Sequence, residues 1–353
     1  MSSFSGEILK VATFGESHGP AVGVVVEGAP AGIALERQAI QDELDRRRPG
    51  TTPLASARQE ADQVEILSGV ADGRTLGSPI ALLVRNIDAR SKDYSALADK
   101  FRPGHADYTY WRKYGLPPQP GGGRSSGRET VGRVAAGAVA RAILAPLGVE
   151  LAAYTIQVGP IRAGAIDPAF AREHPLRAAD PNQAEAMVAE VMAARAAGDS
   201  VGGVVELVIN GAPAGLGDPV FGKLDARLGG AMLSIGGVKG VEIGDGFAAA
   251  ARRGSANNDQ MDADGFLSNH CGGILGGISN GMPLVLRLAI KPTPSISQVQ
   301  RTQNLAGEAV EISIAGRHDP CLCGRIAPVA EAMAALVLAD AWLMQKAQAR
   351  SEK

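Results

Sequence analysis

Short apolar runs, several of them alternating and rich in β-branched residues, predict seven strands along the 353-residue chain. These strands cover residues 8–14, 21–26, 64–67, 80–84, 151–158, 201–209 and 284–290. Stretches rich in Ala, Leu, Met and charged residues predict five helices. The helices cover residues 36–47, 129–144, 182–196, 220–233 and 329–347. The pattern therefore indicates a protein that combines sheets and helices.

One predicted helix has an unusual composition. Residues 130–144 are almost all small and apolar, so this helix should be buried on most sides. A central layer of helices covered by sheets would bury it in this way. By contrast, the helices at 182–196 and 329–347 carry polar positions along one side, and we expect both to face water.

A repeated turn suggests two similar halves. Residues 28–32 read Gly-Ala-Pro-Ala-Gly after an apolar strand, and residues 211–215 repeat this sequence after another strand. A helical run follows each turn, with Leu44-Asp45 in the first run and Leu224-Asp225 in the second. Chance identity between small residues is the alternative, but the matching flanks favour an internal repeat.

Three long stretches show no clear periodicity. They are residues 86–123, residues 244–281, and residues 291–304 with their continuation to 325. Loops of this length are uncommon in compact proteins and usually carry function. The length of the chain allows one large domain or two or three ordinary ones.

The basic residues are mostly arginine. The net charge is −2, and only nine of the 35 basic residues are lysine. Arginine suits bidentate recognition of carboxylate and phosphate, although a GC-rich genome would give the same excess. Eight arginines lie in or beside turns: Arg46, Arg47, Arg48, Arg102, Arg124, Arg128, Arg301 and Arg317. With balanced charge and 4% aromatic residues, the chain lacks the features of a nucleic-acid binder, so small anionic ligands fit better.

Three cysteines, Cys271, Cys321 and Cys323, indicate no disulfide framework, and we expect reduced thiols that are buried or half-buried. The spacing of His, Cys and acidic residues matches no metal motif, so no metal is predicted. The N-terminus has no basic region followed by an apolar run, and no stretch approaches the roughly 20 apolar residues of a membrane span. We therefore expect a cytoplasmic protein without membrane contact.

The segment 121–130, Gly-Gly-Gly-Arg-Ser-Ser-Gly-Arg-Glu-Thr, opens the apolar helix. Glycines let the backbone approach a ligand, a helix start presents free N–H groups, and arginine adds further donors. We expect this segment to hold an oxyanion. It lacks the lysine of a phosphate-binding P-loop, which argues against a nucleoside triphosphatase.

His18 lies beside Ser17 in a sharp turn between two strands, where an imidazole can move a proton near neutral pH. The alternative is a ring that only bonds a backbone carbonyl. Adjacent side chains rarely aim at one another and Gly-x-Ser-x-Gly is absent, so we do not expect Ser17 to act as a nucleophile.

Other histidines occur in distinct settings. His105 lies in a Pro-Gly corner between Arg102 and Asp107, and His318 lies between Arg317 and Asp319. Both clusters are candidates for acid–base chemistry. We expect His270 to be a packed loop residue and His174 to be a solvated surface side chain.

Six segments in this order, residues 13–19, 45–50, 101–110, 121–130, 272–279 and 316–321, resemble motifs of the chorismate synthase family. The resemblance extends from about residue 7 to about residue 345. It implies an α+β fold, a β-α-β sandwich with central helices between two antiparallel sheets and an internal pseudo-twofold repeat. Residues 1–353 would form one domain with two pseudo-symmetric halves, marked by the turns at 28–32 and 211–215, and four copies would form a homotetramer.

The resemblance also implies an activity. Such an enzyme removes phosphate from 5-enolpyruvylshikimate 3-phosphate by an anti-1,4-elimination and so forms chorismate in the shikimate pathway of aromatic amino-acid biosynthesis. It is a flavoprotein that uses reduced FMN without consuming it. The chain has no room for a reductase domain, so a separate NAD(P)H-dependent flavin reductase, using NADH or NADPH, is expected to supply the reduced flavin.

The resemblance assigns roles to individual residues. His18 would protonate or hydrogen-bond the leaving phosphate, His105 would protonate the reduced flavin, and Asp319 would help the flavin take the substrate proton. Ser17 and Ser126 would support these groups. Substrate clamps would be Arg47, Arg48, Arg128 and Arg317. Flavin contacts would be Arg124, Ser125, Ser126, Gly276, Lys291, Pro292, Thr293, Pro294, Ser295 and Arg317.

The chain departs from the family pattern at two places. An arginine usual near Pro53 is absent, and Gly236-Gly237 replaces the Asn-Ala usual at a flavin-contacting turn, which removes a side-chain amide. Two other classes of function remain as rivals. A protein that binds a flavin or a phosphorylated metabolite without chemistry would not need His18, His105 and Asp319, and an RNA-binding module would need a stronger positive charge.

Overall fold

Two five-stranded antiparallel sheets form the outer layers of the computed structural model, which describes residues 3–48, 54, 60–87, 98–314 and 318–348. The first sheet has the order β1-β2-β3-β7-β4 and the second β11-β16-β10-β8-β9. The first comprises β1 (Ser3–Ser5), β2 (Lys10–Phe14), β3 (Ala21–Glu27), β4 (Val64–Ser68) and β7 (Ile80–Arg85). The second comprises β8 (Glu150–Val158), β9 (Ile161–Arg162), β10 (Gly203–Asn210), β11 (Val238–Ile243) and β16 (Leu284–Ile290).

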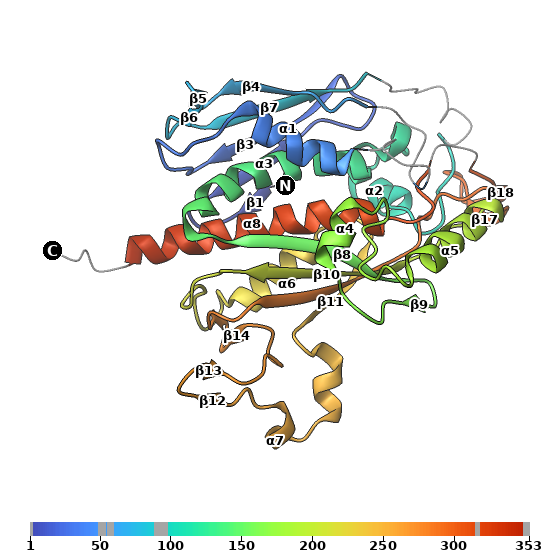
Figure 1. Ribbon diagram of the computed structural model, residues 1–353. Helices are drawn as coiled ribbons and strands as arrows, with labels where there is room; N and C mark the ends of the chain where they lie inside the picture. The colour runs from blue at the N-terminus through green and yellow to red at the C-terminus, as the bar shows by residue number, and fades with distance from the viewer. Residues whose placement is uncertain (1–2, 49–53, 55–59, 88–97, 315–317, 349–353) are drawn as a thin grey trace.

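Four helices lie between the sheets (Figure 1). Helices α1 (Arg37–Arg47) and α3 (Thr130–Leu144) contact the first sheet, and α6 (Leu224–Leu233) and α8 (Cys323–Gln348) contact the second. Helix α3 packs on α8, and at Gly137 a methyl group would overlap Ala332, so the two backbones approach closely. The predicted sandwich with a buried central helix is confirmed.

The last helix is the clearest error of the sequence-based prediction. Helix α8 begins at Cys323, earlier than predicted, and residues 326–341 of it are all buried instead of facing water. Its polar residues are satisfied inside the protein. Glu331 forms an ion pair with Arg46 (2.7 Å), and Asp340 accepts hydrogen bonds from the backbone N–H groups of residues 7–9 (2.8–3.0 Å). A polar stripe on a helix can therefore mark buried ion pairs as well as a solvated face.

Two helical stretches, Gly127–Leu147 and Cys323–Gln348, are long and apolar enough to cross a membrane, so the expectation of no such stretch is wrong. Their most apolar windows are 61% and 89% buried inside the protein. The apolar length of both stretches follows from their place between two sheets, which cover a helix on most sides.

The two halves repeat the same element order. The strands β2-β3-β7-β4 of one sheet match β8-β10-β16-β11 of the other, with α1 and α3 matching α6 and α8. The repeated turns are held alike. The buried Thr75 hydroxyl donates to the carbonyl of Pro30 (2.6 Å), and the buried Ser279 hydroxyl donates to that of Pro213 (2.6 Å). This shared bonding favours the internal repeat over chance identity.

The aperiodic stretches contain short elements. Two hairpins brace the repeated turns: β5 (Val70–Ala71) with β6 (Arg74–Thr75), and β14 (Ile274–Leu275) with β15 (Ile278–Ser279). A segment that extends away from the sandwich carries α7 (Gly254–Asn257), β12 (Met261–Asp262) and β13 (Gly265–Phe266). Beside the second sheet lie α4 (Pro168–Glu173) and α5 (Ala184–Ala196). Short 3-10 turns cover Pro120–Ser125, Gly127–Glu129, Ala145–Leu147 and Gly246–Ala251.

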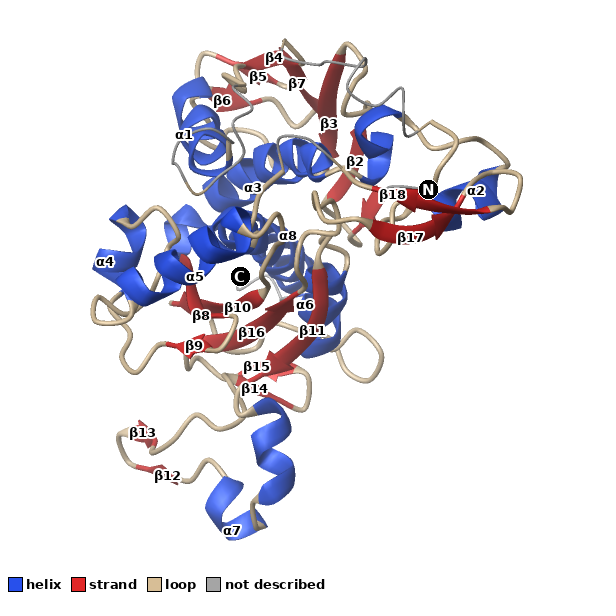
Figure 2. Cartoon of the chain, turned by 90° about the vertical axis from the view of Figure 1, so that its right-hand side faces the viewer, coloured by secondary structure: helices blue, strands red, loops and turns tan. Residues whose placement is uncertain are grey.

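Helix α2 (Asp107–Tyr114) and the hairpin of β17 (Gln300–Gln303) and β18 (Ala309–Ile312) lie at one end of the molecule (Figure 2). A backbone bridge joins Lys100 to Asn304, and Phe101 N donates to the carbonyl of Gln303 (3.1 Å). Two of the long aperiodic stretches therefore meet. The candidate chemical residues of both are brought to the same end of the sandwich.

Candidate functional site

The glycine run before α3 separates two histidines that are far apart in sequence. Gly121, Gly122 and Gly123 all adopt left-handed φ angles, of 62°, 89° and 52°. A methyl group on Gly121 would overlap the ring of His18, and one on Gly122 would lie 2.9 Å from Cε1 of His105. Glycine is required here both by the backbone conformation and by the two rings. The structure thus brings His18 and His105 together across adjacent residues.

Ser17 contacts the neighbouring imidazole. Its Oγ lies 3.1 Å from Nδ1 of His18 and 3.4 Å from the carbonyl oxygen of Pro120, and the side chain is buried. Adjacent side chains therefore do meet in this turn, contrary to expectation. The hydroxyl bonds both the ring and the residue before the glycine run, so it can fix the orientation of His18.

A buried ion pair holds the second imidazole. Arg102 donates to both carboxylate oxygens of Asp107 (2.7 and 2.8 Å), and Nδ1 of His105 lies 2.8 Å from Asp107 Oδ1. Burial opposes ionisation of Asp107, but the hydrogen bonds from Arg102 and His105 hold its pKa far below the usual range. His318 lies near this group, and burial followed by the charge of Arg102 lowers its pKa to about 4. The site thus includes a third imidazole, which is neutral near pH 7.

Two predicted phosphate clamps are buried side by side. Arg47 donates to Thr130 Oγ1 (3.0 Å) and to Asp62 (3.4 Å), and Arg128 donates to Asp62 and to Asn86 Oδ1 (2.8 Å). Burial lowers the pKa of Arg47 to about 9, and nearby cations add to this effect. Its Nε has no hydrogen-bond partner among the described residues. A cluster in which like charges crowd and one donor is orphaned is suited to an anion.

The C-terminal wall of the site is built by residues 291–295 and Asp319. Thr293 Oγ1 donates to the carbonyl of Asp319 (2.7 Å), and the Lys291 ammonium donates to the carbonyl of Gly104. Pro294 lies beside Gly104, one residue from His105. Asp319 pairs with Arg325, whose charge also acts on Arg47. This wall therefore connects the histidines to the arginine cluster.

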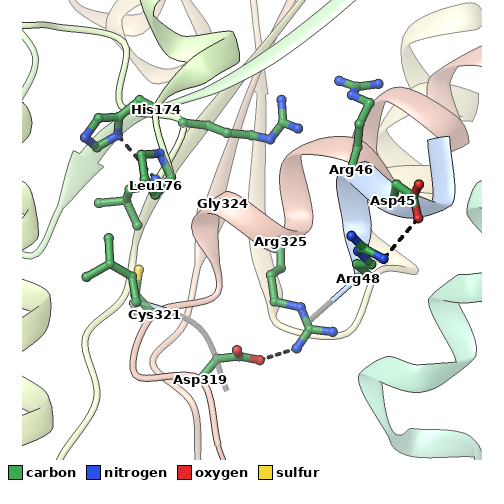
Figure 3. Close-up of a pocket in the computed structure, with 12 residues that line it drawn as sticks. Asp45, Arg46, Arg48, His174, Leu176, Asp319, Cys321, Gly324 and Arg325 are labelled. Carbon is green, nitrogen blue, oxygen red and sulfur yellow. Dashed lines mark hydrogen bonds and ion pairs between the residues drawn. The ribbon is translucent and has the colours of Figure 1, made fainter. Parts of the chain in front are cut away.

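A pocket of about 190 Å³ opens between the end of α1 and the start of α8 (Figure 3). Arg46, Arg48 and Arg325 lie on one side of it, and Arg48 contacts Asp45 (3.6 Å). Arg177 also lines the pocket in a left-handed conformation (φ 53°), with no hydrogen bond or ion pair from its side chain in the described part of the chain. The pocket is therefore basic.

His174 lines the same pocket and is not a solvated surface residue as predicted. Its Nδ1 accepts the backbone N–H groups of Leu176 (3.2 Å) and Ala178 (3.3 Å), and burial lowers its pKa. His270 fits the expectation of a loop residue held by its neighbours, since its ring contacts Asp245 (2.7 Å). The three cysteines are free thiols, and Cys321 and Cys323 are buried, as expected.

The predicted flavin contacts near the glycine run are engaged within the chain. Arg124 donates to the carbonyl of Gly15 (2.9 Å) and to Thr13 Oγ1 (2.6 Å). Ser125 donates to the carbonyl of Gly122 (2.7 Å), and Ser126 Oγ accepts the backbone N–H of Arg128 (3.3 Å). All of these bonds shape the glycine run.

The other predicted flavin contacts differ in their distance from the glycine run and residues 291–295. Gly237 contacts this part of the site, because its carbonyl accepts the N–H of Lys291 (2.9 Å). Gly236 precedes Gly237 in the turn before β11. Gly276 does not contact this part of the site, because it forms the β14–β15 turn, which lies away from α2 in both views (Figures 1 and 2). Arg317 and Pro53 lie outside the described residues.

The sequence-based predictions missed Asp62 and Arg177. Asp62 forms ion pairs with both Arg47 and Arg128, one through each carboxylate oxygen, and it adopts a left-handed φ of 46°. Its sequence neighbourhood carries no recognisable motif, and neither does that of Arg177. A buried carboxylate that bridges two arginines becomes visible only when the fold brings them together.

An α+β sandwich with imidazoles, guanidiniums and carboxylates at one end is typical of an enzyme that acts on a small anionic substrate. The family model described as chorismate synthase matches residues 9–343. Chorismate synthases of Syntrophus aciditrophicus and Methanocella arvoryzae are 53% and 55% identical. The matches cover 97% and 95% of this chain and 98% and 92% of those proteins.

A solved structure points to the same family. A crystal structure titled as chorismate synthase superposes with a TM-score of 0.75 at 33% identity, covering 97% of this chain and 93% of the other. The chain belongs to the chorismate synthase family. It is therefore a carbon–oxygen lyase, as its resemblance to the family implied.

Proposed function

We propose that the protein converts 5-enolpyruvylshikimate 3-phosphate into chorismate and phosphate, with reduced FMN as a cofactor that is not consumed. The reaction would belong to the shikimate pathway in the cytoplasm. The observation that carries the proposal is the placement of His18 and His105 against adjacent glycines, next to buried arginines. Acid–base groups and anion clamps are the two requirements of an elimination that releases phosphate.

The residues at the site fit a flavin. At Gly121 and Gly122 the space that a Cβ atom would fill is taken by the rings of His18 and His105, so a flavin bound against the glycine run would lie next to both imidazoles. Lys291, Thr293 and Gly237 lie on the facing wall and would hold the cofactor together with the glycine run. Reduced FMN would supply the electron-rich group that eases cleavage of the C–O bond.

Each side chain then has a defined task. Arg47 and Arg128 would bind the phosphate, because both are buried and Arg47 has an orphaned donor. His18, held by Ser17, would donate a proton or a hydrogen bond to the departing phosphate. His105 would exchange a proton at Nε2. Asp319, which lies on the C-terminal wall of the site, would assist removal of the proton from the substrate ring. Arg48 and Arg177 would attract the anionic substrate from the adjoining pocket.

The decisive test is anaerobic incubation with chemically reduced FMN and the enolpyruvyl substrate, following phosphate release and diene absorbance. Replacement of His18 or His105 by Ala should lower kcat by about 10–10⁴-fold, the range for acid–base groups, without unfolding the protein. Full activity in both variants would refute the assigned roles. Oxidised FMN with NADH or NADPH alone should give no turnover until a separate flavin reductase is added, and turnover without one would refute the external supply.

We also infer a homotetramer. Large apolar side chains are exposed on the loop before α6 and on the extended segment, notably Phe221 (98%) and Phe247 (85%). Surfaces of this kind commonly become buried between copies of a chain. Light scattering should give four times the mass of the 36.3 kDa chain, and Phe221→Ser with Phe247→Ser should lower it. A monomeric wild-type protein at micromolar concentration would refute this inference.

A further inference from the structure

We propose that Asp107, braced by Arg102, is a positioning residue that fixes the tautomer of His105. The carboxylate would hold a proton on Nδ1, so that Nε2 is the nitrogen that exchanges a proton with the ligand. The consequence for catalysis rests on the function proposed above. The geometry of the three side chains does not depend on it.

The contacts at Nδ1 allow only one arrangement of hydrogens. This nitrogen lies 2.8 Å from Asp107 Oδ1 and 3.1 Å from the NH2 group of Arg102. A guanidinium can only donate and an ionised carboxylate can only accept, so Nδ1 cannot be a partner of both. Arg102 already donates Nε and NH2 to Asp107 at 2.7 and 2.8 Å. Without a proton, Nδ1 would direct its lone pair at a carboxylate oxygen, so it must donate to Asp107.

The surroundings keep this arrangement rigid. The side chains of Arg102 and Asp107 are 5% and 3% exposed, and that of His105 is 13% exposed. The backbone N–H of Arg102 also donates to Asp107 (3.1 Å), which ties the carboxylate to the loop that carries His105. Among the described residues, the charged or titratable groups near this ring also include His318, which burial keeps neutral near pH 7, and Lys291, which donates to the carbonyl of Gly104. Asp107 is thus the only carboxylate found bonded to this imidazole among the described residues.

Nε2 faces the opposite direction. A methyl group on Gly122 would lie 3.1 Å from Nε2, so this nitrogen borders the glycine run, against which the flavin is proposed to bind. A neutral ring with its proton on Nδ1 presents a lone pair at Nε2, and a protonated ring presents an N–H there. Either state can serve a ligand bound against the glycine run. In the other tautomer, the neutral ring would carry its proton on Nε2, and this nitrogen could not accept a proton from a ligand.

The change Asp107→Asn tests this role because the amide preserves shape and removes the charge. Arg102 will keep its hydrogen bonds to the amide oxygen, so the amide nitrogen of the new side chain will face Nδ1 of His105. An N–H group at this place favours the tautomer with the proton on Nε2. In Ser-His-Asp enzymes the same change lowers kcat by about 10⁴-fold through this effect. We expect a fall in kcat of about 10²-fold or more here, with KM for the substrate within twofold. Asp99→Asn, the same change at an exposed site on the same loop, should leave both constants unchanged.

The tautomer can be read directly by NMR of the holoenzyme labelled with ¹⁵N-histidine. The protein has five histidines, and the His105→Gln spectrum identifies the ring in question. Wild-type protein at pH 8 should show the His105 proton on Nδ1, and Asp107→Asn should move it to Nε2. A wild-type ring protonated on Nε2 overturns the proposal, even if the variant does not fold.

Activity adds an independent decision. A loss of kcat in Asp107→Asn with the tautomer and the kcat–pH profile unchanged shows a merely structural role, and it overturns the proposal. Wild-type activity with an altered tautomer also overturns it. If the enzyme makes no chorismate while the NMR result is as expected, the proposed function fails and the positioning of His105 by Asp107 stands.

Discussion

Gly121 offers the sharpest test of how the site is built. Its φ of 62° disfavours any side chain, and a Cβ would overlap the ring of His18. The change Gly121→Ala therefore combines two effects, backbone strain and displacement of the imidazole. Gly115 ends α2 with a φ of 70°, and a methyl group there would meet no atom within 4 Å. Gly115→Ala thus carries the strain without the displacement.

The two effects differ in size and in what they change. An Ala in the left-handed region costs about 1–2 kcal/mol of stability, and both variants should lose about this much. The new methyl group would lie 2.1 Å from the His18 ring, so the ring must move by more than about 1 Å to restore ordinary contact, and a misplacement of this size can lower the rate by about 10²-fold or more. That loss corresponds to about 2.7 kcal/mol in the barrier. Only Gly121→Ala should suffer it.

Both quantities are easily measured. Urea denaturation gives the free energy of unfolding, and single-turnover phosphate release with reduced FMN gives the rate of the chemical step. The expected result is similar destabilisation of both variants and a loss of rate confined to Gly121→Ala. A folded Gly121→Ala enzyme with a rate within threefold of wild type would refute the idea that this glycine sets the position of His18.

Three further predictions concern individual side chains. The pKa of His318 is lowered from 6.5 to about 4, so the contribution of its neutral form to stability is complete above pH 6.5 and is lost as pH falls towards 4. Wild-type protein should therefore lose stability between pH 7 and 4.5, and His318→Gln should make this loss smaller by about 2 kcal/mol. An unchanged dependence of the free energy of unfolding on pH, measured by denaturation, would contradict this. Arg177→Met should raise KM for the substrate at least fivefold while the exposed Arg172→Met does not, and equal KM values would show that the pocket takes no part in binding. Thr75→Val should cost about 1–3 kcal/mol in urea denaturation, because it leaves the Pro30 carbonyl without its donor, and a cost below about 0.3 kcal/mol would be evidence against this.

The sequence predicted the elements whose side-chain pattern is set by burial. Strands β7 and β16 alternate buried positions with half-buried or exposed ones, and α3 is buried on most sides, so their patterns were readable. Edge strand β11 was missed, because a half-exposed strand interrupted by Gly240 has no strong pattern. Helix α2 was missed because Asp107 is its only buried residue. These elements depend on contacts that are distant in sequence.

The site was predictable where chemistry is concentrated in short turns. The glycine run and the turns of His18 and His105 stand out, because glycine permits left-handed backbone and imidazole can move a proton near neutral pH. Asp62 could not be found, since its importance lies in bridging Arg47 and Arg128 from another part of the chain. Buried ion pairs of this kind depend on the fold, whereas a motif depends only on its neighbours.

The internal repeat accounts for the place of the proposed anion site at this end of the sandwich. Helices α3 and α8 occupy equivalent places in the two halves and pack on one another. Arg128 lies just before α3, Arg325 lies in the first turn of α8, and both act on Arg47. The two helix starts therefore approach the same point, and each carries a partial positive charge. Each half alone would bring one helix start, so the packing of the two halves is what brings both starts to Arg47, where we propose that the phosphate binds.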